Sequence, residues 1–148
     1  MLIRTFKEKD RSRVIELWEL CGLIRPWNDP NKDIIRKMTS QPDLFVVLEI
    51  DGVVQATVMI GYDGHRGWMN YLGVSPELRM LGLGRKLVEY AERKLIELGC
   101  PKLNLQVRTT NIEVIEFYKR LGFEQDDVVS LGKRLLKDES HSPPAHPK

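Results

Sequence analysis

The stretch Leu72-Gly73-Val74-Ser75-Pro76-Glu77-Leu78-Arg79-Met80-Leu81-Gly82-Leu83-Gly84-Arg85 decides how this chain folds. An apolar strand runs into a turn that contains Gly82 and Gly84, and a helix follows. Glycine adopts positive φ angles at low cost and lets a ligand approach the backbone closely, and the unpaired amides at a helix N-terminus attract anions. The stretch predicts a phosphate-binding turn, although such glycines also occur in turns that bind nothing.

Two common nucleotide motifs do not fit this spacing. A dinucleotide fingerprint needs a third small residue where Leu87 stands, and a P-loop needs Gly-Lys followed by Ser or Thr, which is absent. Neither a nicotinamide dinucleotide nor a nucleoside triphosphate is therefore expected at this turn.

The chain before this turn predicts mainly antiparallel strands. Alternation with period two in 44–50 and 54–60, separated by Asp51-Gly52, is typical of a hairpin, and a turn at 63–67 leads into a third strand, 68–74. The other expected elements are a strand at 2–6, a helix with Val14, Leu17, Trp18 and Cys21 on one face that ends at Gly22, and a helix from Asp29-Pro30 that buries Ile34, Ile35 and Met38.

The chain after the turn predicts a helical crossover to a parallel strand. A helix over 83–98 presents one apolar face, and the strand 103–107 follows it, which is the connection that parallel neighbours need. Thr110 and Glu113 suggest a capping box for a further helix that ends at Gly122. We expect a last strand within 128–136 and a disordered tail over 138–148. The fold class is α/β, more narrowly α+β.

Composition indicates one domain, residues 1–137, with a small partner. The formal charge of +2 comes from 23 basic and 21 acidic residues that are interspersed, so no nucleic-acid or membrane partner is expected. Cys21 and Cys100 lack the spacing of a zinc site or a disulfide framework, and no metal is expected. We expect a cytoplasmic protein, either a monomer or a homodimer.

Two motifs resemble those of one enzyme family. Arg79, Gly82 and Gly84 resemble the coenzyme-A signature of the GCN5-related N-acetyltransferases (GNAT), Arg/Gln-x-x-Gly-x-Gly/Ala after a strand. The run 111–123, with its Asn, Phe-Tyr and Gly-Phe, is similar to the second signature of that family. The loops 25–30 and 61–67 look like those of its small bacterial YpeA-type members.

The resemblance implies a mixed, mostly antiparallel sheet flanked by helices, with a V-shaped splay between the strands 68–74 and 103–107. It implies that the chain is an acetyl-CoA-dependent N-acetyltransferase in which Tyr118 protonates the leaving thiolate. Backbone groups of Leu72 and Val74 would pair with the pantetheine arm, and Asn111 would steady it. The implied cofactor set is Leu72, Val74, Arg79, Met80, Leu81, Gly82, Leu83, Gly84, Arg85 and Asn111. Between the Arg and the first Gly of the coenzyme-A signature, family members commonly carry glycine or polar and basic residues. This chain has Met80-Leu81 at those two positions.

The sequence leaves the acceptor and the general base open. The acceptor amine is a small metabolite, a peptide N-terminus or a lysine, and it attacks the thioester directly in a ternary complex. The alternative is a coenzyme-A-binding module without turnover. The acceptor pocket is expected to involve Trp27, Tyr62, His65, Arg66 and Asn70, with the basic pair favouring a carboxylate. Candidates for the base are Asp63, His65, Glu49, or a water held by Asn70 or Tyr71.

Overall fold

The computed structural model describes residues 1–138 and contains one five-stranded sheet in the order β1-β2-β3-β4-β5. The first four strands are antiparallel neighbours, and β5 pairs with β4 in parallel. The strands are β1 (Leu2–Thr5), β2 (Phe45–Ile50), β3 (Val53–Tyr62), β4 (Gly67–Val74) and β5 (Leu103–Asn104). The α+β class and the mixed, mostly antiparallel sheet are confirmed.

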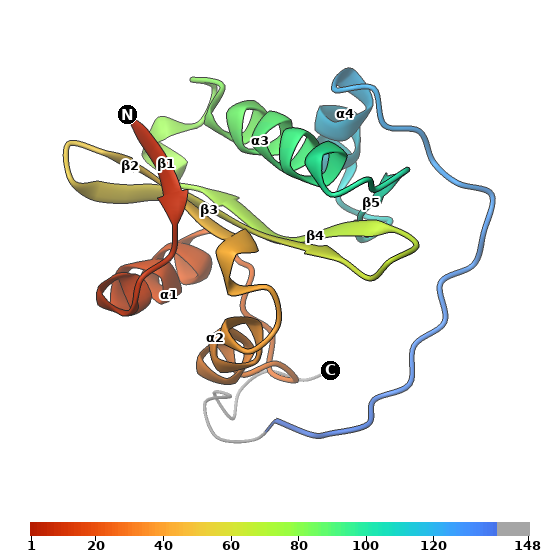
Figure 1. Cartoon of the computed structure of the whole chain (residues 1–148), viewed down its shortest axis with the longest axis horizontal. Helices are drawn as coiled ribbons and strands as arrows, with labels where there is room; N and C mark the ends of the chain where they lie inside the picture. The colour runs from red at the N-terminus through yellow and green to blue at the C-terminus, as the bar shows by residue number, and fades with distance from the viewer. Residues whose placement is uncertain (139–148) are drawn as a thin grey trace.

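Helices cover both faces of the sheet (Figure 1). One face carries α1 (Arg11–Leu20) and α2 (Pro30–Met38), and the other carries α3 (Leu83–Glu97) and α4 (Ile112–Arg120). Three single-turn helices connect the larger elements: η1 (Glu8–Asp10), η2 (Pro42–Leu44) and η3 (Pro76–Leu78).

Each face of the sheet has its own apolar core. Leu83, Leu87, Ala91 and Leu95 of α3 are buried on one side, as their spacing predicts, whereas Leu98 is 49% exposed. On the other side Val14, Leu17, Trp18 and Ile34 are fully buried with Phe45. Ile35 is 56% exposed, so the expected stripe on α2 is narrower than its apolar residues suggest. A fully buried large aliphatic side chain contributes about 1.5–3 kcal/mol, so these two cores hold the helices on the sheet.

Local signals place several element ends correctly. Asp51 (φ 51°) and Gly52 (φ 78°) form the hairpin turn between β2 and β3, and positive φ at both central residues is what a type I′ turn needs. Asp29 caps α2 by accepting hydrogen bonds from the amides of Asn31 and Lys32. The expected capping box of Thr110 is wrong, because the structure makes Asn111 the N-cap residue of α4 and its side chain makes no capping bond.

The predicted last strand within 128–136 is also wrong. These residues belong to an extended segment without strand pairing, which we call the C-terminal arm, residues 124–138. Side-chain bonds from Lys102 and Asn104 to Asp126 and from Gln106 to Ser130 link its start to the β5 region, in place of a backbone ladder. The arm therefore buries no apolar face, and Val129 and Leu131 are 83% and 90% exposed.

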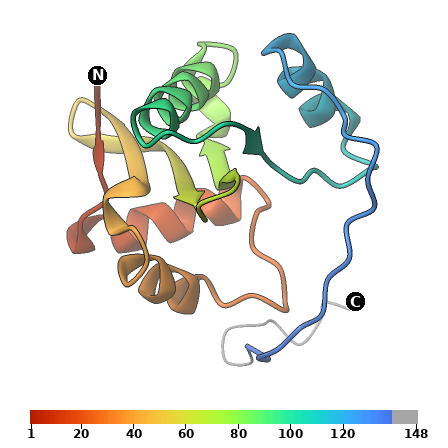
Figure 2. The same cartoon turned by 45° about the vertical axis from the view of Figure 1, so that its right-hand side comes forward.

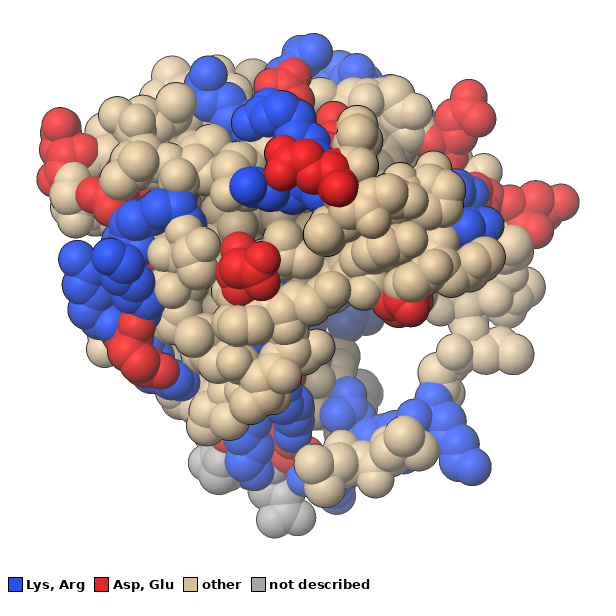
Figure 3. Space-filling model, in the orientation of Figure 1, with Lys and Arg blue, Asp and Glu red and all other residues tan. Residues whose placement is uncertain are grey.

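The C-terminal arm runs down one side of the molecule and is fastened to α2 (Figure 2). Asp138, the first residue assigned to the tail, is buried there and pairs with Arg36; the rest of the expected tail lies outside the described residues. Figure 3 shows an opening between the arm and the body, and basic and acidic side chains mixed over this face. Within residues 1–138 no helix is long and apolar enough to cross a membrane.

Candidate functional site

The glycine turn presents backbone amides at the start of α3. Met80 (φ 73°) and Gly82 (φ 79°) both adopt left-handed conformations, and α3 begins at Leu83. The Lys86 amide donates to the Gly82 carbonyl at 3.1 Å, so the amides of residues 83–85 precede the first hydrogen bond of the helix. Met80 is 99% exposed, so its side chain does not cover the backbone of the turn. These amides suit the diphosphate of a coenzyme.

The second glycine of the turn has a different role from the first. A Cβ on Gly84 would lie 3.3 Å from Phe117 Cζ and 3.6 Å from Val74 Cγ2, whereas a Cβ on Gly82 would meet nothing within 4 Å. Gly84 therefore lets the start of α3 approach both α4 and β4. Arg79 donates from Nε to the Val74 carbonyl at 3.4 Å, which ties the turn to the end of β4.

Strands β4 and β5 separate immediately after they meet. Their pairing consists of Gly67 with Leu103 and Trp68 with Asn104, and β5 is shorter than the predicted strand 103–107. The predicted cofactor residues Leu72 and Val74 lie on the part of β4 beyond this pairing, where β5 no longer covers the strand edge. A ligand arm could therefore bind between the two strands.

A bulge in β4 lies just beyond its last pair with β5. Register with β3 shifts between Thr57 opposite Gly73 and Met59 opposite Asn70, and Tyr71 inside the shift has φ 54°. A left-handed conformation costs a non-glycine residue about 1–2 kcal/mol. Bulges re-aim backbone groups and side chains, and here the bulge contains Leu72 as well as Tyr71.

Tyr118 lies in the buried face of α4. Its side chain is 8% exposed, and its ring meets Phe117 and Phe123 edge-on at centroid distances of 5.0 and 5.4 Å. Burial raises the pKa of the Tyr118 hydroxyl above its usual value, so the group stays protonated. The hydroxyl makes no hydrogen bond to any residue within 1–138. A proton donor without a protein partner is what a leaving thiolate needs.

Tyr118 also lines a groove of about 1420 Å³. Its walls are residues 102–109, α4 and the first part of the C-terminal arm. The Asn104 Oδ1 atom is buried nearby and has no hydrogen-bond partner among the described residues. Asn111 stands at the start of α4 with an exposed side chain that makes no capping bond, so its amide remains able to contact a ligand.

The predicted acceptor residues fall into separate groups. Tyr62, His65 and Arg66 surround the β3–β4 turn, next to the end where β4 and β5 pair. Asp63 holds this turn by accepting the amides of His65 and Arg66 at 2.8 and 2.7 Å, and these bonds lower the pKa of its carboxyl. Trp27 instead contacts Arg108, which lies past the end of β5. The Arg108 Cζ atom is 5.4 Å from the centre of the Trp27 ring. Asn70 is exposed on β4 between the two groups.

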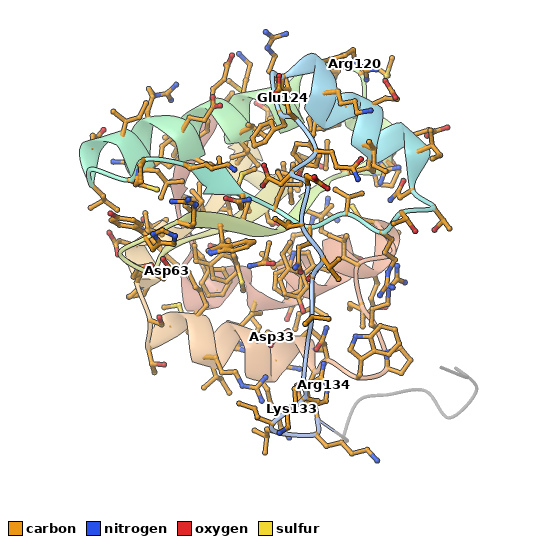
Figure 4. All side chains as sticks on the ribbon, turned by 90° about the vertical axis from the view of Figure 1, so that its right-hand side faces the viewer. Asp33, Asp63, Arg120, Glu124, Lys133 and Arg134 are labelled. Atoms are coloured by element: carbon orange, nitrogen blue, oxygen red, sulfur yellow. The ribbon has the colours of Figure 1, made fainter. Side chains whose placement is uncertain are left out.

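The structure adds a pair that the sequence did not connect. The Tyr71 hydroxyl donates to the Asp33 Oδ2 atom at 2.5 Å, joining β4 to α2 across 38 residues of sequence. The sequence suggests Tyr71 only as one of several residues that could hold a catalytic water. Nothing in the sequence marks Asp33 as functional, because it occupies an ordinary polar position on a helix. Figure 4 places Asp33 on the face that the C-terminal arm crosses, well apart from Asp63. Among described residues, no cluster could hold a metal ion.

Comparison with known proteins supports one family. Residues 11–123 match the family model described as "Acetyltransferase (GNAT) family". The structure of Ard1 from Thermoplasma volcanium aligns with a TM-score of 0.75 and 26% identity, over 83% of this chain and 82% of that chain.

Two further solved structures are similar in fold. One is the ribosomal-protein-S18-alanine N-acetyltransferase from Escherichia coli, with a TM-score of 0.71 and 20% identity, over 84% of this chain and 78% of that chain. The other is glucosamine-6-phosphate N-acetyltransferase from Arabidopsis thaliana, with a TM-score of 0.65 and 22% identity, over 90% of this chain and 97% of that chain.

Proposed function

Because the chain belongs to the acetyltransferase (GNAT) family, we propose which of its residues carry the reaction and where the acceptor binds. The chain is an acetyl-CoA-dependent N-acetyltransferase. When bound, acetyl-CoA supplies an acetyl thioester, whose carbonyl carbon an amine attacks to give an amide and free coenzyme A. Such a reaction needs amide donors for the cofactor, a base for the amine and an acid for the leaving sulfur.

The cofactor site that we propose runs along one edge of β4. The amides from Met80 to Arg85 hold the diphosphate, and Arg79 fixes the turn on which they lie. The backbone of Leu72 and Val74 pairs with the pantetheine arm in the gap left by β5, and the Asn111 side chain steadies that arm. Tyr118 donates its proton to the departing thiolate. The observation that carries this proposal is the pair of left-handed residues, Met80 and Gly82, directly before a helix whose first amides are uncapped.

The acceptor site that we propose lies on the opposite face, beneath α2 and the C-terminal arm. Trp27 and Asn70 border it near the splay, and His65 and Arg66 border it at the β3–β4 turn. The Tyr62 side chain packs on the α3 side of the sheet instead, so it could contact the acceptor only from that side. The basic pair on that turn would favour an acceptor with a carboxylate.

The identity of the acceptor stays open within this proposal. One structural neighbour is described as acting on an alanine of a ribosomal protein and another on glucosamine 6-phosphate, so this fold serves both protein and sugar amines. We also propose membership of the small bacterial YpeA-type group, on the loops 25–30 and 61–67, and a cytoplasmic location, in keeping with the free thiols Cys21 and Cys100.

A competing function is a coenzyme-A-binding module without turnover. Release of coenzyme-A thiol is measured with acetyl-CoA and a panel of amines: glycinamide, a peptide with an N-terminal alanine, putrescine, glucosamine and glucosamine 6-phosphate. We expect amine-dependent release with at least one of them. Tight binding of acetyl-CoA without release for any amine would favour the module.

A further inference from the structure

The Tyr71–Asp33 pair stands where the acceptor side of the sheet meets the bulge in β4. Tyr71 precedes Leu72, the first residue that we propose to contact the cofactor arm, and its side chain lies on the α1–α2 face. Its hydroxyl donates to Asp33 at 2.5 Å, and the Asp33 side chain is 23% exposed. A carboxylate in contact with both a buried phenol and solvent can receive a proton and pass it on.

Several contacts hold Tyr71 in this strained position. Its ring stacks on the Trp18 indole with 3.9 Å between ring centres. The Trp18 Nε1 atom donates to the Thr57 hydroxyl at 3.0 Å, and that hydroxyl donates to the Tyr71 carbonyl at 2.9 Å. A residue held in a costly backbone conformation by a buried network suggests a functional constraint.

Charged side chains of α2 and the C-terminal arm surround the pair. Arg36 lies 3.1 Å from Asp33 on the same helix but also forms a bidentate pair with Asp138 of the arm. Asp29 caps the helix, and Asp29, Asp33 and Asp138 all act to raise the pKa of the Tyr71 hydroxyl, after the larger effect of burial. Lys32 is the other cation near Asp138. Arg134 of the arm donates to Asn28, beside Asp29, so cations and carboxylates are balanced around the pair and Asp33 is the carboxylate in contact with the Tyr71 hydroxyl.

We infer that Tyr71 and Asp33 remove the proton from the acceptor amine. The amine nitrogen donates its proton to the Tyr71 hydroxyl oxygen, while that hydroxyl passes its own proton to the Asp33 carboxylate. Tyrosine is regenerated and Asp33 becomes neutral until it releases the proton to solvent. The neutral nitrogen forms its bond to the acetyl carbon as the carbon–sulfur bond breaks, and Tyr118 protonates the sulfur. The nitrogen then loses its second proton to solvent, and solvent returns one proton to the Tyr118 oxygen. This inference rests on the proposed function, with Tyr71 catalytic and Asp33 its positioning residue.

The other candidates for the base fit the structure less well. Glu49 lies on β2, two strands away from β4, and its carboxylate is paired with Arg4. The Asp63 carboxylate already accepts the two amides of its own turn and the indole N–H of Trp68 on β4. His65 lies on the same exposed turn, at the end of β4 where the strands are still paired.

The test compares Tyr71→Phe, Asp33→Asn and Asp33→Glu with the wild-type chain. The amine used is the member of the panel above that the wild type acetylates fastest. Tyr71→Phe keeps the ring on Trp18 and Asp33→Asn keeps the shape of the side chain. Matched controls are Tyr90→Phe on α3 and Asp51→Asn at the exposed β2–β3 turn. Turnover, the acceptor KM, the acetyl-CoA Kd by calorimetry and the melting temperature are measured for each.

We expect Tyr71→Phe and Asp33→Asn to lower turnover on the order of 10²-fold, the usual contribution of a positioned base, with the acetyl-CoA Kd unchanged. Asp33→Glu should recover part of this loss. Turnover of Asp33→Asn should rise about tenfold per pH unit below the pKa of the amine, because the variant depends on neutral amine from solution. Turnover of the wild-type chain should rise less steeply with pH.

Two results would overturn the inference. The first is a Tyr71→Phe variant with the turnover of the Tyr90→Phe control and only a lower melting temperature. That result would make the pair a structural link between β4 and α2. A pH profile of Asp33→Asn parallel to that of wild type would place the base elsewhere. If the wild type acetylates no amine of the panel, the proposed function fails rather than the role of this pair.

Discussion

At the residue scale, Gly82 and Gly84 look equivalent in sequence but meet different requirements. Gly82 needs a positive φ angle, whereas Gly84 needs the absence of a side chain beside Phe117. Substitution at these positions therefore damages different properties of the protein.

We expect Gly82→Ala to weaken acetyl-CoA binding and to cost about 1–2 kcal/mol of stability, because alanine is strained at φ 79°. Gly84→Val should lower the melting temperature further and also reduce turnover, because its side chain would displace Phe117 and with it α4. Calorimetry and thermal unfolding check both. The control is Gly132→Ala, since Gly132 has no neighbour within 4 Å. Identical behaviour of the Gly82 and Gly84 variants would contradict the distinction.

Tyr118→Phe should reduce turnover by about 10²-fold with little change in acetyl-CoA affinity. The change removes one hydroxyl and keeps the ring between Phe117 and Phe123. A positioned general acid contributes on the order of 10²–10⁴, and the low end applies because a thiolate is a good leaving group. Steady-state kinetics and calorimetry separate the two effects, with Tyr90→Phe as the control. An equal loss of affinity and turnover would make the hydroxyl a binding group.

At the element scale, the C-terminal arm depends on polar contacts at its two ends. Asp126 and Ser130 contact the β5 region, while Asp138 pairs with Arg36 and accepts the Asp29 amide at 3.0 Å. The apolar side chains between these ends are exposed, and Arg134 adds a hydrogen bond to Asn28 Oδ1 at 3.2 Å, so polar contacts rather than apolar packing hold the arm in place.

The fastening at Asp138 should depend on pH. The Arg36 pair, and then the Asp29 amide, lower the pKa of the Asp138 carboxyl in the folded state. A group with a lowered folded pKa contributes its stability fully above its unfolded pKa, near 3.9, and loses it as the pH falls towards the folded value. We expect the Asp29 amide, which donates to Asp138, to exchange faster relative to its intrinsic rate below about pH 4. Hydrogen exchange measures this, and Asp138→Asn should show fast exchange already at pH 7. Equal protection in that variant would mean that other contacts hold the arm.

The β3–β4 turn offers a test of the acceptor site. We expect the double variant His65→Ala, Arg66→Ala to raise the KM for carboxylate-bearing amines more than for amines without one, because a charge-assisted contact is lost. The turn itself should persist, because Asp63 bonds to the backbone amides of these residues. Equal KM values for both kinds of amine would remove the two residues from the site.

At the scale of the whole molecule, the sheet separates the two substrates that we propose. The glycine turn, Asn111 and Tyr118 belong to the side of α3 and α4, whereas Asp33 and the Tyr71 side chain belong to the side of α1 and α2 (Figure 1). The gap beyond the short β4–β5 pairing is where the two would meet.

Acetyl-CoA should raise the melting temperature of the whole chain. The turn and the splay exist only in the folded state, so a ligand at 100 times its Kd stabilises that state by about 2.7 kcal/mol. Adenosine should have a much smaller effect. A nicotinamide dinucleotide that shifts the transition, while acetyl-CoA leaves it unmoved, would contradict the cofactor site.

The sequence alone determined most of the elements and the family. Apolar patterns and turn signals predicted all five strands of the sheet and the major helices, because burial on one face imposes those spacings. The glycine turn and the Asn, Phe-Tyr, Gly-Phe run indicated the family, because local backbone requirements leave local signals. The cofactor residues and the role of Tyr118 follow from that resemblance and stay predictions. The element ends at Gly22, Asp29 and Asp51-Gly52 were correct for the same reason.

Only the tertiary structure decided the features that depend on distant contacts. The absence of a last strand follows from where Asp126 and Ser130 bind, and the Tyr71–Asp33 pair joins residues 38 positions apart. The bulge at Tyr71 depends on Trp18 and Thr57. A sequence pattern reports the local preference and burial of each residue, whereas these contacts depend on which elements the packed sheet brings together.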